Sequence, residues 1–375
     1  MHQHKALFST IAAFIACLLL LAACGEKGSN ATEPELTLQN VKLAFIHVGD
    51  QADRGYTARQ HAGTLAMMAN LGITDTQVLN FWNIAPGAAV TTSVEEAIEW
   101  GAHMIFGTSF AFGAPMLEAA RIYPDVSFFH ATGNLAVEAN LPNYHNYFGN
   151  MSQGRFLSGV AAGLRTETNK LGFVAAWPNP EVITGFTAFF LGAQSVNPDV
   201  EMYVMYLNAW NNPTVEGQIA QALIDRGADV LSQHADSPTT QTVAQSNGVW
   251  SVGYNNDMSA EAPDAFLVAP MFDWSIYLTY AVRTFVEGGT VRTDVLYGLN
   301  ENMILLSALN QNTIAPGTAE AIAEAEARLR GGWNIFTGPI FGADGTQILG
   351  DGEQWREPIS APSWAHIIRG ITVLD

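Results

Sequence analysis

The sequence predicts an α/β protein made of two lobes, each built on a parallel β-sheet. From Val41 onward, short apolar runs alternate with amphipathic stretches of helix length, which is the pattern of successive βα units. Most of the apolar runs are continuous, as expected for strands whose two faces are both covered by helices. The 375 residues are enough for two domains or for one body with two lobes.

The sequence predicts nine strands, and several of them are followed directly by residues that favour the start of a helix. They span residues 41–48, 76–81, 103–108, 126–131, 170–177, 200–207, 229–233, 250–254 and 265–269. Two helices are expected to begin at the pairs Asn179-Pro180 and Asn212-Pro213, because asparagine is a favourable N-cap and proline suits the first helical residue. A further helical run covers residues 316–330.

The chain also contains an internal similarity. The letters KLAFI at 42–46 are echoed by KLGFV at 170–174, and GAHMI at 101–105 by GADVL at 227–231. Nearly equal spacing of the two matches predicts two lobes of the same plan. We expect the first lobe at 41–148 completed by part of 262–330, and the second at 149–261 completed by part of 331–375.

The amino terminus is expected to be a secretory signal rather than part of the fold. Residues 6–23 carry no charge, follow Lys5 and run into the letters LAAC, of which the last is Cys24. This ending predicts cleavage after residue 23 and lipidation of Cys24. A single membrane span is the alternative, since an apolar stretch of this length could just cross a bilayer. From Cys24 to about residue 40 we expect a tether without hydrophobic periodicity.

Composition excludes several classes of function. Both cysteines, Cys17 and Cys24, lie at the amino terminus, so the remaining chain has no disulfide, no thiolate nucleophile and no cysteine metal site. The net charge of −19 opposes binding to nucleic acids and anionic lipid surfaces. Charged residues make up 14% of the chain, against about 25% in an average domain. This low share indicates a large buried core.

No enzymatic motif stands out in the sequence. A glycine-rich phosphate loop, a dinucleotide-binding fingerprint, a nucleophile elbow and a zinc-protease motif are all missing. His234 and Asp236 could supply two metal ligands, but no third ligand follows at an informative spacing, and a hydrogen-bonded pair at a strand end is the alternative. We therefore predict a non-enzymatic protein with no catalytic residues, no cofactor and no metal.

Aromatic and acidic side chains gather where the predicted strands end, which is where ligands bind in parallel α/β sheets. Aromatic faces and carboxylates suit a flat, neutral ligand rich in hydrogen-bond donors, because stacking a base on an aromatic ring contributes roughly 1–3 kcal/mol. For each ring alone, ordinary core packing is the alternative, and Asp236 could instead cap the helix that Pro238 opens. The candidate ligand-binding residues are Asp53, Tyr56, Phe110, Trp177, Trp210, Asp236 and Asp257.

Longer motifs around these residues carry a family resemblance. They are DRGYT at 53–57, GTSF at 107–110, NKLGFVAAWP at 169–178, QHADSP at 233–238, GYNNDM at 253–258 and FTGPI at 336–340. In these motifs the chain resembles the basic membrane protein family of ABC-transporter substrate-binding lipoproteins, which includes purine nucleoside receptors. The resemblance implies a type I periplasmic-binding fold, with two Rossmann-like lobes joined by a hinge, and delivery of the ligand to an ABC permease. It also implies purine stacking between aromatic rings, with polar groups of the ligand bound by Asp257.

The chain departs from the nucleoside-binding branch of that family at two places. That branch carries Phe-Asn where this chain has Tyr56-Thr57, and a lysine where this chain reads APMF at 269–272. A free purine base is therefore expected at least as strongly as a nucleoside. We expect a monomeric receptor, lipid-anchored on the extracytoplasmic side of a bacterial membrane, that closes on its ligand by hinge motion. The alternatives are a ligand-sensing partner of a membrane signalling protein and, less favoured, a nucleoside hydrolase.

Overall fold

The computed structural model describes residues 35–357, 359 and 361–375. The predicted signal, the lipidation site at Cys24 and residues 24–34 of the predicted tether lie outside the described residues. Residues 37–375 form one compact unit, and the following description applies to it. No helix in the described part of the chain combines the length and the apolarity that crossing a bilayer requires.

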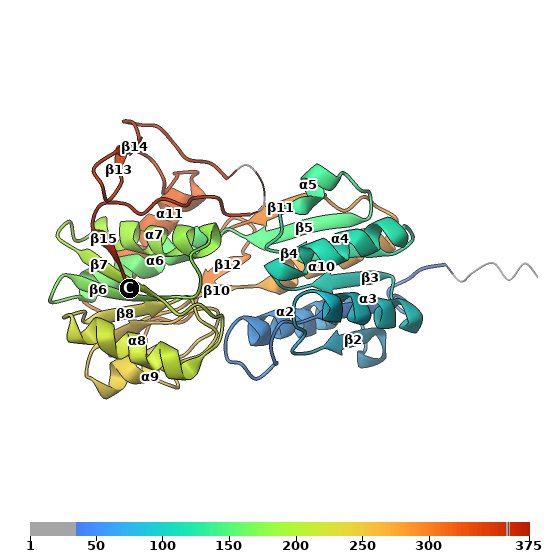
Figure 1. Ribbon diagram of the computed structural model, residues 1–375, viewed down its shortest axis with the longest axis horizontal. Helices are drawn as coiled ribbons and strands as arrows, with labels where there is room; N and C mark the ends of the chain where they lie inside the picture. Colours follow the sequence, from blue (N-terminus) through green and yellow to red (C-terminus); the bar gives the residue numbers. More distant parts are fainter. Residues whose placement is uncertain (1–34, 358, 360) are drawn as a thin grey trace, which may run out of the picture. The chain divides into compact units, whose positions relative to one another are not determined.

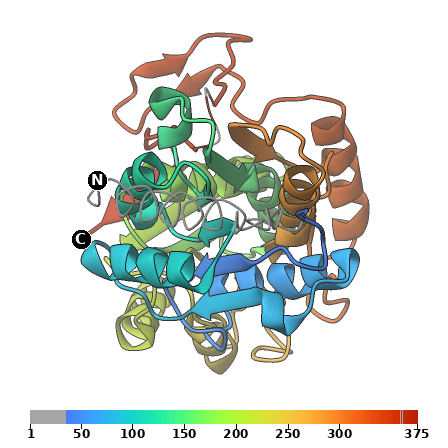
Figure 2. The same cartoon turned by 90° about the vertical axis from the view of Figure 1, so that its right-hand side faces the viewer.

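One half of this unit is built on a parallel sheet in which six strands of the described chain lie in the order β11, β5, β4, β3, β1, β2. The strands are β1 (Leu43–Ile46), β2 (Val78–Phe81), β3 (Met104–Gly107), β4 (Ser127–Ala131), β5 (Tyr144–Gly149) and β11 (Asp294–Tyr297). Their helices are α2 (Tyr56–Leu71), α3 (Ala88–Trp100), α4 (Gly113–Ile122), α5 (Leu135–Ala139) and α10 (Trp274–Val286), with short 3-10 turns η1 (Asp75–Gln77) and η2 (Phe110–Phe112). Helices flank the strands on both sides (Figure 2).

The other half repeats this plan with five strands of the described chain, in the order β15, β7, β6, β8, β9. The strands are β6 (Lys170–Ala175), β7 (Glu201–Tyr206), β8 (Val230–Gln233), β9 (Trp250–Val252) and β15 (Ile371–Leu374). Its helices are α6 (Met151–Arg165), α7 (Pro180–Gln194), α8 (Pro213–Asp225), α9 (Thr239–Ser246) and α11 (Thr318–Arg330). In Figure 1 this half lies on the left and the six-stranded half on the right.

Two short antiparallel ribbons complete the described chain. They pair β10 (Pro270–Phe272) with β12 (Ile304–Leu306), and β13 (Ile340–Phe341) with β14 (Gln347–Leu349). The late strands β11 and β15 pair in parallel with β5 and β7. Each large sheet therefore receives one edge strand from the last third of the sequence.

The sheets confirm the predicted α/β class with two parallel-sheet lobes. β1 lies between β2 and β3, and β6 lies between β7 and β8, so the similar sequences at 42–46 and 170–174 occupy equivalent strands. Residues 265–269, predicted as a strand, instead form a single bridge, between Phe266 and Ser251. The strands predicted from the sequence do not include β5, β11 or β15, which belong to the two large sheets.

The two predicted asparagine caps are confirmed. The Asn179 side chain accepts a hydrogen bond from the Val182 N–H at 3.0 Å, and the Asn212 side chain accepts one from the Val215 N–H at 3.3 Å. In each helix the proline follows the cap directly and opens the first turn. These local signals start α7 and α8 right after β6 and β7, which places the loops before them at the edge of the sheet.

Strand register in the six-stranded sheet aligns a row of aromatic rings. Phe45 is the register partner of Phe106, Phe106 of Phe129, and Phe129 of His145. Their rings stack with centroid separations of 4.6–4.8 Å. Offset aromatic pairs at this distance contribute stabilisation beyond their buried area, so this row holds β1, β3, β4 and β5 together.

Helices α6 and α7 approach each other closely through glycines. A Cβ atom built on Gly159 would lie 2.0 Å from the Phe189 carbonyl oxygen, and one on Gly192 would lie 2.0 Å from the Phe156 carbonyl oxygen. Only glycine allows backbones to come this near. The α6–α7 pair is thus a tightly fixed layer, and it carries two side chains discussed below, Arg155 and Glu181.

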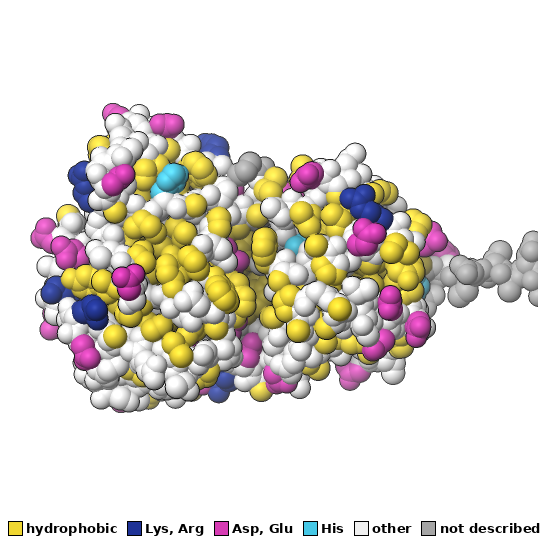
Figure 3. All heavy atoms as spheres, in the orientation of Figure 1, with side chains coloured by type: hydrophobic (Ala, Val, Ile, Leu, Met, Phe, Trp, Pro, Cys, Tyr) yellow, Lys and Arg dark blue, Asp and Glu magenta, His cyan; other side chains and the backbone are white. Residues whose placement is uncertain are grey.

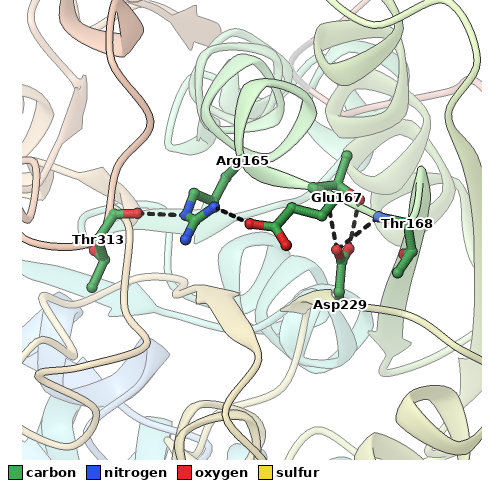
Figure 4. Close-up of polar contacts among 6 residues, drawn as sticks. Arg165, Glu167, Thr168, Asp229 and Thr313 are labelled. Carbon is green, nitrogen blue, oxygen red and sulfur yellow. Dashed lines mark hydrogen bonds and ion pairs between the residues drawn. The ribbon is translucent and has the colours of Figure 1, made fainter.

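A carboxylate fixes the loop that leads into β6. Asp229, directly before β8, accepts three hydrogen bonds from residues 166–168 at 2.5–2.9 Å (Figure 4). Beside it, Arg165 donates from Nε to the Thr313 carbonyl at 2.8 Å and pairs with Glu167 at 3.2 Å. These contacts tie the starts of β6 and β8 to the loop before α11.

Candidate functional site

A cavity lies where the carboxyl ends of the two sheets face each other. Its empty volume, including space open to solvent, is about 380 Å³, and the room left between its walls is narrow. It is lined by Val48, Tyr56, Thr108, Ser109, Phe110, Thr132, Glu181, Trp210, His234, Asp236, Tyr254 and Asn255.

The wall from the six-stranded half is held in place by buried neutral groups. Tyr56 opens α2, and its phenol oxygen accepts a hydrogen bond from Gln60 Nε2 at 3.0 Å. Burial raises the pKa of Tyr56 well above its usual value, so the phenol is neutral. His130 Nε2 lies 3.0 Å from the Ser109 carbonyl oxygen and 3.1 Å from that of Phe110. Burial lowers the pKa of His130 to about 4, so a neutral imidazole donates to this turn.

Two residues of the lining have strained backbones and unpaired oxygens. Thr132 has φ of 59° and Asn255 has φ of 67°, and the left-handed region is particularly unfavourable for a β-branched residue such as threonine. Thr132 Oγ1 and Asn255 Oδ1 are buried without a hydrogen-bond partner among the described residues. Strain of this kind persists where the surrounding structure enforces it, commonly at ligand sites. Both oxygens are therefore available to a bound molecule.

The Asp236 carboxyl is the acidic group buried in the lining. It is 8% exposed, and its Oδ1 accepts only long hydrogen bonds, from the Tyr56 N–H at 3.3 Å and from Asn255 Nδ2 at 3.5 Å. Burial, and next the nearby Asp53 carboxylate, raise the pKa of Asp236 well above its usual value. This favours the protonated acid, which can donate one hydrogen bond to a ligand and accept others.

The wall from the five-stranded half combines aromatic rings with the Glu181 carboxylate. His234 Nε2 lies 3.6 Å from Glu181 Oε1, and the His234 ring centroid lies 5.9 Å from that of Trp210 and 4.6 Å from that of Tyr254. Burial lowers the pKa of His234, and the nearby Arg155 guanidinium lowers it further, against the opposing effect of Glu181. The rings thus form an aromatic, largely uncharged surface with one carboxylate at its side.

The structure separates the sequence-predicted site residues into two groups. Tyr56, Phe110, Trp210 and Asp236 line the cavity. Asp53 instead accepts three hydrogen bonds from backbone N–H groups at the start of α2, at 2.8–3.0 Å. Trp177 is 38% exposed, and Asp257 is exposed with its side chain accepting from the Ser259 N–H at 2.9 Å. Within the described chain, these last three are not among the residues lining the cavity.

The alternative prediction for Asp236 was that it caps the helix after Pro238. In the described structure α9 has no side-chain cap from Asp236. The buried Glu216 carboxylate takes this place, since it accepts from the Thr240 N–H at 3.0 Å and from the Ser237 hydroxyl at 2.5 Å. Asp236 is therefore left facing the cavity.

Sequence reasoning missed several lining residues, chiefly Glu181, Tyr254 and Asn255. Asn255 stands two positions before Asp257 in the same motif, and it follows the end of β9 more closely. Because β9 ends at Val252 and not at the predicted residue 254, the edge of the sheet lies closer to the start of this motif. Glu181 lies in the first turn of α7, and the predicted cap at Asn179 could have indicated that this turn faces the same edge.

The two halves touch beside the cavity. The Asn256 side chain donates to the Gly55 carbonyl oxygen at 2.9 Å, and Arg54 forms an ion pair with Glu261. A Cβ atom on Gly55 would lie 2.6 Å from Asp236 Cα, so glycine is required for this approach.

Among the described residues, no group of three or more His, Cys, Asp or Glu side chains is arranged to hold a metal ion. On the face shown in Figure 3, charged side chains are sparse and scattered, while hydrophobic and uncharged side chains dominate. The arrangement of the cavity can bind and enclose a small neutral molecule.

Comparisons with known proteins agree with this geometry. A purine-binding protein of Brucella abortus (strain 2308) is 34% identical over 319 residues, covering 84% of this chain and 89% of that protein. A Haloferax volcanii protein, named as a proposed ABC transporter glucose-binding protein, is 30% identical over 311 residues, covering 83% and 78%. An ABC transporter solute-binding protein from Conexibacter woesei superposes with a TM-score of 0.66 at 20% identity, covering 78% of this chain and 97% of that one.

The last of these supports the type I periplasmic-binding fold predicted from the sequence. Residues 40–327 match the family described as Bmp, ABC transporter substrate-binding protein PnrA-like. Members of this family bind substrates without catalysing a reaction. The chain therefore belongs to the Bmp family of PnrA-like substrate-binding proteins, and it is a solute-binding protein of an ABC transporter.

Proposed function

We propose that this solute-binding protein captures a purine base or purine nucleoside outside the cytoplasm and passes it to an ABC permease. The observation that carries the proposal is the buried Asp236 carboxyl in a narrow, ring-lined space. The pKa of Asp236 is raised by burial, and a protonated acid matches the ring nitrogens of a purine, which accept hydrogen bonds. A relative that is named as purine-binding supports the same ligand class.

The residues that line the cavity indicate which contacts a bound purine would make. Tyr56, Trp210 and Tyr254 offer ring surface, and each base–ring stacking contact contributes roughly 1–3 kcal/mol. Phe110, which is 54% exposed, stands at the rim, where it can cover a bound base. Thr132 Oγ1 and Asn255 Oδ1, unpaired within the described residues, are positioned to meet polar edges of the ligand.

The setting of the protein is part of the proposal. A signal at residues 1–23 and lipidation of Cys24 would place the binding unit on the extracytoplasmic face of a membrane, joined to it by the tether. This location suits a family that hands ligands to permeases. Asp53, Trp177 and Asp257 stay predicted ligand contacts, and those at Trp177 and Asp257 are tested below.

Calorimetric titration of the purified protein with purine bases, nucleosides and glucose tests the ligand class. We expect a purine to bind and glucose not to bind. Binding of glucose with no binding of any purine would overturn the proposal, and glucose is included because of the Haloferax relative.

Paired variants test the site. We expect Trp210→Ala and Asp236→Ala to weaken purine binding by about 5- to 150-fold, because each removes a contact of roughly 1–3 kcal/mol. Trp177→Ala and Asp257→Ala are the matched partners, since they remove the same side-chain types from outside the lining. A larger loss in this second pair would place the ligand at the sequence-predicted positions instead.

A further inference from the structure

One buried histidine contacts both loops that the six-stranded half contributes after β3 and β4. His130 lies near the end of β4 and is 1% exposed. Its Nε2 reaches the carbonyl oxygens of Ser109 and Phe110 in the loop after β3, and its own strand continues into Thr132. Ser109, Phe110 and Thr132 line the ligand cavity, whereas His130 is not among the described residues that do so. His130 can therefore affect a bound ligand only through these loops.

The partners of the His130 ring determine which of its nitrogens carries the proton. Carbonyl oxygens only accept hydrogen bonds, so Nε2 is the donor and Nδ1 the acceptor. Nδ1 lies 3.2 Å from Asn146 Nδ2, and Asn146 is oriented by its Oδ1, which accepts the Ala136 N–H at 2.6 Å. The Tyr144 hydroxyl, 3.1 Å from Nδ1, can donate to the Gly113 carbonyl at the same distance. One chain of hydrogen bonds thus runs from the start of α5 through Asn146 and His130 to the loop after β3.

Two glycines leave the His130 ring no room to turn. A Cβ atom built on Gly113 would lie 2.4 Å from His130 Cε1, and one built on Gly133 would lie 2.0 Å from His130 Nδ1. The start of α4 and the loop after β4 therefore both close on the ring. Gly133 directly follows Thr132, whose φ of 59° is left-handed. The enclosed ring supports this conformation from one side and the Ser109–Phe110 turn from the other.

The position of the Phe110 ring depends on its backbone. Phe110 is 54% exposed, so packing against other side chains holds it only in part. Its carbonyl accepts the hydrogen bond from His130 Nε2 at 3.1 Å, and the preceding Ser109 carbonyl accepts both from His130 and from the Phe112 N–H at 3.0 Å. A group that is ordered before binding does not have to be ordered at the expense of affinity. Fixing this turn in the free protein should therefore strengthen binding.

We propose that His130 is a positioning residue for ligand binding, which holds the Ser109–Phe110 turn so that the Phe110 ring already stands over the cavity when a purine enters. The inference rests on the proposed function and adds a residue that controls affinity without touching the ligand. Because the effect passes through Phe110, it differs from that of a histidine that only stabilises the fold.

A double-mutant cycle, measured by calorimetric titration with adenine and adenosine, tests the inference. His130→Phe keeps an aromatic ring and removes its hydrogen bonds, and we expect it to weaken binding of the tighter purine at least fivefold. In the Phe110→Ala background the same substitution should weaken binding less than twofold, because the ring that His130 positions is gone. The melting temperature should fall by similar amounts in both backgrounds. His130→Gln, whose amide can donate and accept, should weaken binding at least twofold but less than His130→Phe does.

Tyr144→Phe is the matched control. It removes a buried hydroxyl that contacts the Gly113 carbonyl and His130 Nδ1, and it leaves the contacts of the Ser109 and Phe110 carbonyls in place. We expect a lower melting temperature with an affinity changed less than twofold. Hydrogen exchange of the ligand-free protein, followed by mass spectrometry, provides a second measurement. The peptide that contains residues 109–112 should exchange faster in His130→Phe than in the wild type or in Tyr144→Phe.

The outcomes separate the two proposals. If His130→Phe lowers the melting temperature and leaves affinity unchanged, or if its effect on affinity is the same with and without Phe110, His130 serves the fold alone and the purine proposal stands. Unchanged hydrogen exchange at residues 109–112 would also overturn the inference. If neither purine binds the wild type, the purine proposal fails, and the exchange rates alone decide whether His130 holds the turn. If His130→Phe does not fold, the same cycle with His130→Gln decides.

Discussion

Replacing Gly55 by alanine should hold the two halves of the molecule apart. A Cβ atom at this position would lie 2.6 Å from Asp236 Cα and 2.9 Å from the Asp236 carbonyl carbon. Carbon atoms in ordinary contact are about 3.5–4.0 Å apart, so the halves must move by about 1 Å. The obstructing atoms belong to the backbone, and therefore no side-chain rotation can relieve the contact.

Overpacking of this kind costs about 1–3 kcal/mol. If the cost applies only when the halves are together, ligand affinity falls by about 5- to 150-fold. Calorimetry with the best purine ligand measures this loss. Small-angle scattering of the ligand-free protein should show a larger radius of gyration for Gly55→Ala than for the wild type.

Gly350→Ala serves as the control, because its added Cβ atom would lie 3.4 Å from Glu353 Oε2 and meet no backbone atom within 4 Å. We expect it to change neither affinity nor radius of gyration. If Gly55→Ala binds the ligand as tightly as the wild type with an unchanged radius, the contact between the halves does not control binding, and the reasoning is refuted.

Four further predictions concern stability and processing. Because the pKa of Asp236 is raised, the folded protein binds the carboxyl proton more tightly than the unfolded chain does, and the stability that this proton contributes is lost as pH rises from about 3.8 through the folded pKa. The melting temperature should therefore fall between pH 4.5 and 8, and Asp236→Asn should make that fall smaller. An identical pH dependence in the variant and the wild type would contradict this. Asn179→Ala removes the cap of α7 and should lower the free energy of unfolding by about 1 kcal/mol, whereas Asn179→Ser should restore most of it. Asp229→Ala deprives residues 166–168 of three hydrogen bonds and should cost about 1–3 kcal/mol in denaturant unfolding, while Asp225→Ala on the surface should cost less than about 0.5 kcal/mol. Cys24→Ala should abolish incorporation of radiolabelled fatty acid, and continued labelling would place any lipid elsewhere.

The sequence carried most of the fold because its signals were local. Continuous apolar runs marked β1 to β4 and β6 to β9, and asparagine-proline pairs marked the starts of α7 and α8. β5 was not predicted, because His145 and Asn146 interrupt its apolar pattern. Their burial depends on distant partners, the Arg292 carbonyl and His130. Residues 265–269 are apolar because they are buried beside β9, although only Phe266 forms a bridge.

The sequence predicted where the site lies, at the ends of the strands, better than it predicted which residues line it. Tyr56, Phe110, Trp210 and Asp236 were identified from their position after strands. Glu181 was not, because it lies in the first turn of α7 rather than at a strand end. A sequence pattern places a carboxylate at a helix start but does not reveal that this turn faces a cavity.

The late strands also bear on aggregation during synthesis. Until residues 294–297 and 371–374 have emerged, the six-residue strands β5 and β7 are the edges of their sheets. Long open edges recruit strands from other chains, and short ones do so much less. β11 and β15, with four residues each, replace them as edges. A nascent chain is therefore most vulnerable to self-association just before its final strand is made, and a short truncation there would leave that vulnerability permanent.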